Sequence, residues 1–68
     1  MYQYDRLKSL RREKKLNQSA IAELLDTTQQ QYSKYEKGIQ EIPAHHLITL
    51  ARFYQISVDY ILGLTDKR

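Results

Sequence analysis

The sequence contains no cysteine, one proline and two glycines among its 68 residues. Without cysteine, the chain has no disulfide framework and no thiolate metal site, so packing between its elements or association between chains must supply the stability. The small number of turn-forming residues argues against a β-sandwich with its many tight turns. No internal repeat, low-complexity tract or linker interrupts the chain. The composition therefore predicts one all-α domain over residues 1–68.

A long apolar run is also absent. No stretch approaches the roughly 20 apolar residues that a membrane-spanning helix needs. The first residues are charged rather than apolar, unlike the start of a signal peptide. We therefore expect a cytoplasmic protein without a membrane partner.

Groupings typical of catalytic and metal sites are missing as well. His45 and His46 are sequence neighbours and should diverge on a helix, so they indicate no metal site. Glu36 could serve as a catalytic carboxylate, but no second acid, serine or histidine lies at a spacing that suggests a partner. We therefore expect that the protein is no enzyme and uses neither a cofactor nor a small-molecule ligand.

Positive charge is what the sequence has in excess. The formal net charge is +3, which suggests a polyanionic partner such as nucleic acid. The basic residues crowd near the N-terminus, at Arg6, Lys8, Arg11, Arg12, Lys14 and Lys15. Such a cluster is also typical of an ordinary solvated helix face, so both interpretations stay open at this point.

The first third of the chain predicts two helices. Leu7 and Leu10 lie three residues apart among charged neighbours, which indicates an amphipathic helix over about residues 4–15. Asn17 is a good N-cap for a second helix over residues 18–25. Within that helix, Ile21 and Leu25 share the buried face, and the small Ala22 lets another helix approach closely.

A third helix follows after a break at residues 26–28. Thr28 and Gln31 have the spacing of a capping box, in which each side chain satisfies a free backbone N–H at a helix start. We therefore predict a helix from about Gln29, with Tyr32, Tyr35 and Glu36 on one face. Gly38 ends this helix, where a left-handed residue is favoured.

Two further helices complete the predicted domain. Pro43 suits the first turn of a helix over about residues 44–54, because its missing N–H would have no partner there. Ser57 is the expected cap of a short helix over residues 58–62, and Gly63 stops it. The core should span about residues 5–63, and we expect the tail, residues 64–68, to fray. The buried stripe of the fourth helix is predicted to contain Leu47, Leu50, Ala51 and Tyr54.

Two short helices separated by three residues, with a small alanine where they cross, form a helix-turn-helix arrangement. In such a unit, the second helix enters the major groove of DNA. Over about residues 5–63 the chain resembles the repressor family of phage and bacteria called Cro-like or XRE-like. The matching positions are Leu7, Arg11, Leu16, Asn17, Gln18, Ile21, Ala22, Leu25, Thr28, Tyr35, Glu36, Lys37, Gly38, Pro43, Leu47, Leu50, Ala51, Ile56, Ser57, Val58 and Asp59.

This resemblance implies a compact five-helix bundle of the lambda-repressor-like type, in a bacterium or a phage-infected cell. It implies that the start of the third helix reads base edges in double-stranded DNA and that Gln18 contacts a phosphate. It also places Arg11 across from Glu36, which favours a buried structural ion pair over a catalytic role for Glu36. The expected function is a transcriptional regulator, a repressor, bound as a homodimer to a two-fold symmetric operator.

The residue chemistry at the third helix independently favours base reading. A glutamine amide offers one donor and one acceptor, which match N6 and N7 of adenine in the major groove. We assign base contacts to Gln29 and Gln30, and we assign Lys34, about one turn further, to a guanine edge or a phosphate. A solvated polar helix start is the alternative interpretation of the glutamine run.

Phosphate contacts are expected on both sides of the reading helix. Asn17 and Gln18 stand at a helix N-terminus, where free N–H groups and the helix dipole favour an anion. Thr28 and Lys37 could hold the other strand. The loop of residues 39–42 carries one acid and no base, unlike the basic loop common in the family, so we predict a modest salt dependence.

Two further expectations concern the turn and the self-contact. Asp26 stands where the family usually has glycine, so we expect a left-handed backbone there with some strain. Tyr60, Leu62 and Leu64 offer more apolar surface than one short helix can bury, and we expect them in the dimer contact. A rival function is a protein-interaction module, an antitoxin or adaptor, that uses the same fold.

Overall fold

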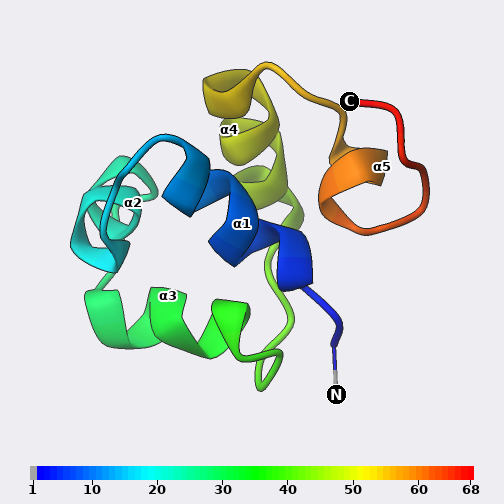
Figure 1. Ribbon diagram of the computed structural model, residues 1–68. Coiled ribbons are helices and arrows are strands. Elements are labelled where there is room, and N and C mark those ends of the chain that lie inside the picture. Colours follow the sequence, from blue (N-terminus) through cyan, green and yellow to red (C-terminus); the bar gives the residue numbers. More distant parts are fainter. Residues whose placement is uncertain (1) are drawn as a thin grey trace.

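Five α-helices make up the computed structural model of the protein, which describes residues 2–68 (Figure 1). Within these residues there is no β-strand, and each helix ends within two residues of its predicted limits. The all-α prediction is therefore confirmed. The helices are α1 (Asp5–Glu13), α2 (Gln18–Leu24), α3 (Gln29–Glu36), α4 (Ala44–Tyr54) and α5 (Val58–Ile61). None of the described helices has both the length and the apolar character needed to cross a membrane.

Three of the helices begin with the side-chain caps that were predicted. The side-chain oxygens of Asn17, Thr28 and Ser57 accept from backbone N–H groups three residues on, at 2.9, 3.1 and 3.0 Å. Each bond satisfies a donor that the helix itself leaves unpaired. These caps explain why α2, α3 and α5 start at the positions read from the sequence.

Two details of the predicted helix starts are wrong. The capping box at α3 is only half formed, because among the described residues the Gln31 side chain makes no return hydrogen bond to Thr28. Ordering a long glutamine side chain in water loses rotamer entropy that one hydrogen bond barely offsets. Pro43 is the N-cap of α4 rather than part of its first turn, because its ψ of 150° is extended.

Apolar side chains from every helix meet in one core. The most buried large side chains are Leu7 of α1, Ile21 of α2, Tyr32 of α3, Leu50 of α4 and Ile61 of α5, each less than 2% exposed. The remaining buried members are Tyr4, Leu10, Ala22, Leu25, Tyr35, Ile42 and Tyr54. The predicted buried faces of α1, α2 and α3 are thus confirmed.

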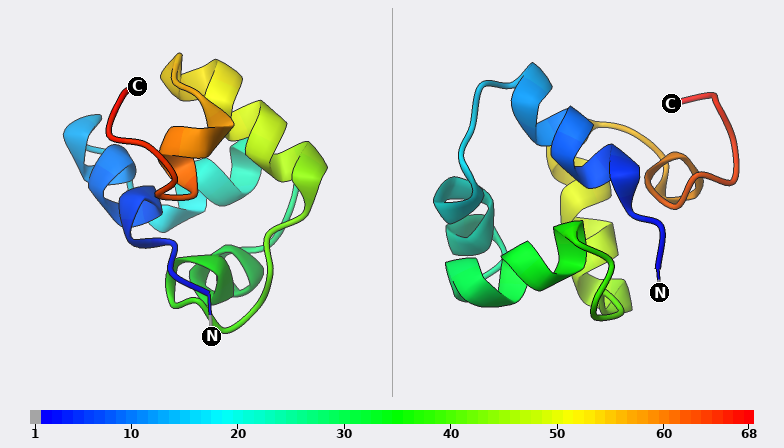
Figure 2. Two further views of the ribbon diagram at one scale, coloured as in Figure 1. Left: turned by 90° about the vertical axis from the view of Figure 1, so that its right-hand side faces the viewer. Right: turned by 60° about the horizontal axis from the view of Figure 1, so that its bottom comes forward.

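The arrangement of the helices presents α3 at one side of the domain. α2 packs on α3, α1 contacts both α3 and α5, and α4 contacts α5. Figure 1 shows α3 as a green helix at the bottom of the molecule, with α1 above it toward the centre, and the right view of Figure 2 shows the same order. The exposed side of α3 is therefore available to an external partner.

A tight turn joins α2 to α3. Asp26 has the predicted left-handed conformation, with φ of 57°. The backbone N–H of Asp26 donates to Glu23 at 3.1 Å, and that of Thr27 donates to Ala22 at 2.9 Å, which satisfies the free carbonyls at the end of α2. The turn sets the angle between the two helices.

Gly38 ends α3 with φ of +72° and lies against the start of the chain. The backbone N–H of Tyr2 donates to the carbonyl of Gly38 at 3.0 Å. A Cβ at position 38 would collide with the carbonyl oxygen of Tyr2. The N-terminal segment and the end of α3 are thus held together, as Figure 2 shows.

The C-terminal tail lies against α1 and α5, where we had expected a frayed end. The Arg6 guanidinium donates to the Tyr60 carbonyl at 2.7 Å and to Asp66 at 2.9 Å. Arg68 donates to both carboxylate oxygens of Glu13, at 2.9 and 2.6 Å. These are pairs between residues far apart in the sequence, so no local pattern indicated them.

Candidate nucleic-acid interface

The exposed side of α3 holds the residues assigned to base reading. Gln29, Gln30 and Lys34 are all exposed. They share an open groove of about 470 Å³, which is lined by Gln18, Gln29, Gln30, Ser33, Lys34, Lys37 and Ile39. The fold therefore brings the three assigned base-reading residues together with two of the assigned phosphate contacts.

The other two assigned phosphate contacts, Asn17 and Thr28, do not line this groove. Both are exposed, and both use their side-chain oxygens as helix caps. The Asn17 amide nitrogen and the Thr28 hydroxyl hydrogen remain as donors, because the caps use only the oxygens as acceptors. Either residue can still donate to a phosphate while it caps its helix.

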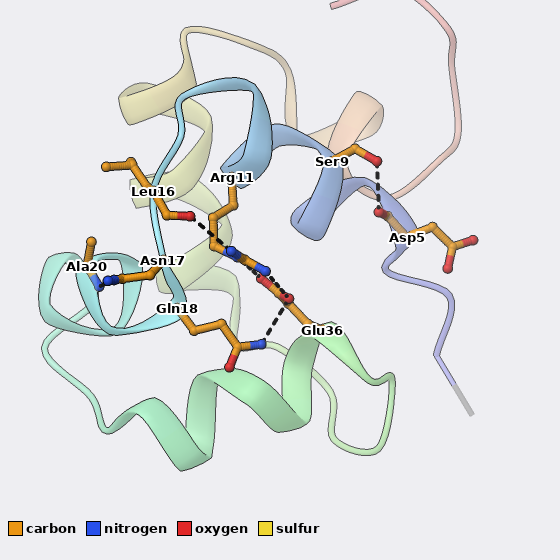
Figure 3. Close-up of polar contacts among 8 residues, drawn as sticks. All are labelled: Asp5, Ser9, Arg11, Leu16, Asn17, Gln18, Ala20 and Glu36. Atoms are coloured by element: carbon orange, nitrogen blue, oxygen red, sulfur yellow. Dashed lines mark hydrogen bonds and ion pairs between the residues drawn. The ribbon is translucent and has the colours of Figure 1, made fainter.

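Gln18 has a second role that the sequence did not indicate. Its amide nitrogen donates to Oε1 of Glu36 at 3.1 Å, and the residue is only half-exposed (Figure 3). A phosphate can only accept hydrogen bonds, so the Gln18 side chain has one N–H left for it. The residue connects the start of α2 to the end of α3 in addition to any contact with DNA.

An ion pair between Arg11 and Glu36 holds α1 against α3. Arg11 Nε donates to Oε2 of Glu36 at 2.7 Å and an Arg11 terminal nitrogen donates to Oε1 at 3.1 Å. A further Arg11 N–H donates to the carbonyl of Leu16 at 2.9 Å (Figure 3). The side chains are 11% and 4% exposed. This is the buried structural pair expected from the family resemblance.

The ionisation of Glu36 reflects these contacts. Burial alone would raise the pKa of its carboxyl, but Arg11, the Tyr32 hydroxyl and the Gln18 amide together outweigh burial and hold the pKa below its ordinary value of 4.5. The hydrogen bond to Glu36 in turn raises the pKa of Arg11. Both groups are therefore charged at neutral pH, as a structural pair requires.

Two tyrosines of the core lie near this pair. Burial raises the pKa of Tyr54 to about 12 and raises that of Tyr32 as well. Within residues 2–68, neither buried hydroxyl has a partner in good hydrogen-bond geometry, although the Tyr32 hydroxyl lies close enough to Glu36 to lower the pKa of that carboxyl. The phenols thus act as large packing groups in the core.

The two histidines contact each other instead of diverging. Their ring centroids lie 4.2 Å apart, and the His46 ring also packs edge-on against Tyr35 at 5.9 Å. Neighbouring Cβ atoms on a helix point in different directions, but side-chain rotation brings the two rings together. Burial, together with the neighbouring His45, lowers the pKa of His46. Among residues 2–68, no three or more metal-ligating side chains gather where an ion could be held.

Three residues near the groove were missed in the sequence. Ser33 and Ile39 line it, and Ile39 is 60% exposed. Ser19 donates from its hydroxyl to Oε1 of Gln29 at 2.6 Å. Ser19 follows Gln18 at the start of α2, so its position beside the assigned anchor was the one available signal.

The residues expected in the dimer contact differ in their exposure to solvent. Tyr60 is half-buried, and the guanidinium carbons of Arg6 and Arg68 lie 4.0 and 5.2 Å from its ring centroid. Leu62 packs partly against the core. Leu64 is 72% exposed. Tyr60 and Leu62 are half-buried within the domain, so Leu64 offers the most exposed apolar surface of the three.

A helix-turn-helix family model matches residues 7–61. The chain belongs to this family. The family resemblance read from the sequence is therefore confirmed, and the pair α2 and α3 is its helix-turn-helix unit.

Relatives in two bacteria are similar in sequence. YobD of Bacillus subtilis, an uncharacterized HTH-type transcriptional regulator, is 44% identical over 61 residues, which cover 90% of this chain and 54% of YobD. RC0668 of Rickettsia conorii, named in the same way, is 39% identical over 59 residues, which cover 85% of this chain and 47% of the relative. The chain thus spans about half the length of these relatives.

Solved structures share the fold. A transcriptional regulator from Listeria innocua superposes with a TM-score of 0.86 at 28% identity, over 96% of this chain and 61% of that protein. The P22 c2 repressor, solved in complex with a synthetic operator, gives a TM-score of 0.80 at 24% identity, over 91% of this chain and 94% of the repressor. The likeness to the P22 repressor is one of fold alone.

Proposed function

We propose that this protein is a sequence-specific DNA-binding transcriptional regulator, a repressor, that docks α3 in the major groove. The observation that carries the proposal is the single exposed surface formed by Gln29, Gln30, Lys34 and Lys37 on a helix-turn-helix domain. The relatives YobD and RC0668 are named as HTH-type transcriptional regulators, which supports the proposal. We infer a binding role without catalysis, in the cytoplasm of a bacterium or a phage-infected cell.

The dimensions and chemistry of α3 fit this role. The major groove, about 12 Å wide, admits one α-helix. The amides of Gln29 and Gln30 match adenine, and Lys34 reaches a guanine or a phosphate. Backbone contacts come from Asn17, Gln18, Thr28 and Lys37.

A homodimer on a two-fold symmetric operator is part of the proposal. One α3 reads few base pairs, and two copies about 10 to 10.5 bp apart give useful specificity. We assign the self-contact to Tyr60, Leu62 and Leu64, of which Leu64, 72% exposed, offers the most apolar surface. Sedimentation of the protein with operator DNA should show two chains per duplex, and a single chain per duplex would contradict the dimer.

Selection of bound duplexes from a random DNA pool tests the function. We expect an enriched two-fold symmetric sequence with adenines in each half-site. Gln30→Ala should relax the preference at one base pair, at a cost of about 1 to 3 kcal/mol. Gln31→Ala is the matched control, because Gln31 lies on the same helix and does not line the groove. No enriched sequence would favour the rival function, a protein-interaction module.

A further inference from the structure

The first two side chains of α2 both reach across to α3. Gln18 donates to Glu36 at the end of α3, and Ser19 donates to Gln29 at its start, with 2.6 Å between Ser19 Oγ and Gln29 Oε1. The first bond belongs to the network around the buried ion pair. The second bond joins two exposed residues and adds nothing to the core, so it can only affect how these side chains are arranged at the surface.

The bond from Ser19 distinguishes the two ends of the Gln29 amide. A hydroxyl that donates to Oε1 fixes the oxygen on the side of Ser19 and leaves both N–H groups and one lone pair of Oε1 free. A glutamine without such a partner can rotate its amide and exchange the two ends. Adenine presents its donor N6 and its acceptor N7 in one fixed order, so only one amide orientation matches it.

Gln30 provides an internal comparison. Within residues 2–68, no hydrogen bond from another side chain reaches the Gln30 amide, although Gln30 lines the same groove as Gln29. The two neighbouring glutamines therefore differ in how their amides are held.

We propose that Ser19 is a positioning residue that orients the Gln29 amide and thereby sets the base preference at one position of the operator. The inference rests on the proposed function, because it needs a DNA duplex in the groove. Ser19 acts through Gln29 and requires no contact of its own with a base.

The test compares base preferences for wild type, Ser19→Ala, Ser19→Thr and Gln29→Ala on operator duplexes substituted at each position. Ser19→Ala should lower the preference at the position read by Gln29 by about 2- to 10-fold, the range expected for one lost hydrogen bond. The preference at the position read by Gln30 should not change. Ser19→Thr retains the hydroxyl and should retain the preference.

Two controls separate positioning from other roles. Ser9→Ala removes an exposed serine hydroxyl from α1, away from the groove, and should leave every preference unchanged. The double variant Ser19→Ala with Gln29→Ala should lose no more preference than Gln29→Ala alone, because Ser19 acts only through Gln29.

Several outcomes would overturn the inference. An unchanged preference in Ser19→Ala, or an equal loss of affinity on every duplex, would show that Ser19 does not orient Gln29, and the equal loss would indicate a phosphate contact. Loss of preference in Ser19→Thr equal to that in Ser19→Ala would contradict a role for the hydroxyl. If the wild-type protein selects no DNA sequence, both the proposed function and this inference fail. If the wild type selects a sequence but Ser19→Ala has the same base preferences, this inference alone fails.

Discussion

The Arg11 guanidinium donates to both carboxylate oxygens of Glu36, at 2.7 and 3.1 Å, and so joins α1 to the last turn of α3. Gln18 of α2 donates to the same carboxylate at 3.1 Å. One side chain of α3 is thus held by the two helices that pack beside it. We infer that this carboxylate fixes the orientation in which α3 is presented to a partner.

Removing one partner of this pair should destabilise the domain. We expect Arg11→Ala to lower the free energy of unfolding by about 3 to 5 kcal/mol, because it leaves a buried carboxylate without its counter-ion. Urea denaturation measures the change. Arg12→Ala, at an exposed neighbouring position, should stay within about 0.5 kcal/mol of wild type. An unchanged midpoint for Arg11→Ala would contradict the structural role of the pair.

The pair should also make stability depend on pH in the acid range. The pKa of Glu36 is lower in the folded protein than its ordinary value of 4.5, so the unfolded chain binds the proton more readily. The stabilisation is complete above pH 4.5 and is lost as the pH falls through the folded pKa.

Melting temperatures of wild type and Glu36→Gln between pH 6 and pH 3 test this dependence. Glu36→Gln should be less stable at pH 6, and its melting temperature should fall less steeply toward pH 3. Glu13→Gln is a necessary comparison, because Arg68 lowers the pKa of Glu13 as well. Parallel curves for wild type and Glu36→Gln would show that Glu36 does not cause the slope.

The left-handed Asp26 offers a stabilising substitution. Its φ of 57° is unfavourable for a residue with a side chain. Asp26→Gly should raise the free energy of unfolding by some tenths of a kcal/mol up to about 1 kcal/mol. Glu23→Gly, at an exposed position within α2, should lower the free energy of unfolding by roughly 0.5 to 1 kcal/mol. A lower melting temperature for Asp26→Gly would be incompatible with this account of the turn.

The two glycines should differ in their tolerance of a methyl group. Both have positive φ, but a Cβ at Gly38 meets the Tyr2 carbonyl whereas a Cβ at Gly63 meets nothing within 4 Å. Gly63→Ala should therefore lower the free energy of unfolding by about 1 to 2 kcal/mol, through backbone strain alone. Gly38→Ala should lose more, about 2 to 5 kcal/mol, because the clash adds to the backbone strain. Equal losses in thermal denaturation would disprove the close contact.

The salt dependence of DNA affinity should show which residues contact phosphates. If Lys37 neutralises one phosphate, Lys37→Ala should reduce the slope of log K against log salt by about 0.9. Binding to a fixed operator duplex at several salt concentrations measures the slope. Lys67→Ala, in the tail, is the control and should leave the slope unchanged. A slope that Lys37→Ala does not alter would remove Lys37 from the interface.

The features that were predicted correctly depend on chemistry within a few residues. The caps at Asn17, Thr28 and Ser57 and the helix end at Gly38 each follow from one side chain and the neighbouring backbone. The assigned residues of α3 share a surface because helical spacing places them on one side. The helix limits and the shared surface of Gln29, Gln30 and Lys34 could therefore be read from the sequence.

The features that were missed depend on contacts between distant residues. The Tyr4 hydroxyl accepts from the backbone N–H of Ile42 at 3.3 Å, which buries a loop residue that no periodic pattern marked. The left-handed conformations of Lys15 and Gln55 were missed for a different reason, because neither residue type favours them. The hydrogen bond from Ser19 to Gln29 could not be predicted from local sequence patterns either, because it depends on the angle at which α2 packs against α3.

The contact between Tyr2 and Gly38 has a practical consequence for experiments. A fluorophore or affinity tag joined to the N-terminal segment would sit next to the end of α3 and could disturb the binding that it is meant to report. A label is better placed on the outer face of α4, where Arg52 is exposed. Because the chain has no cysteine of its own, a single Arg52→Cys substitution would provide a unique attachment point there.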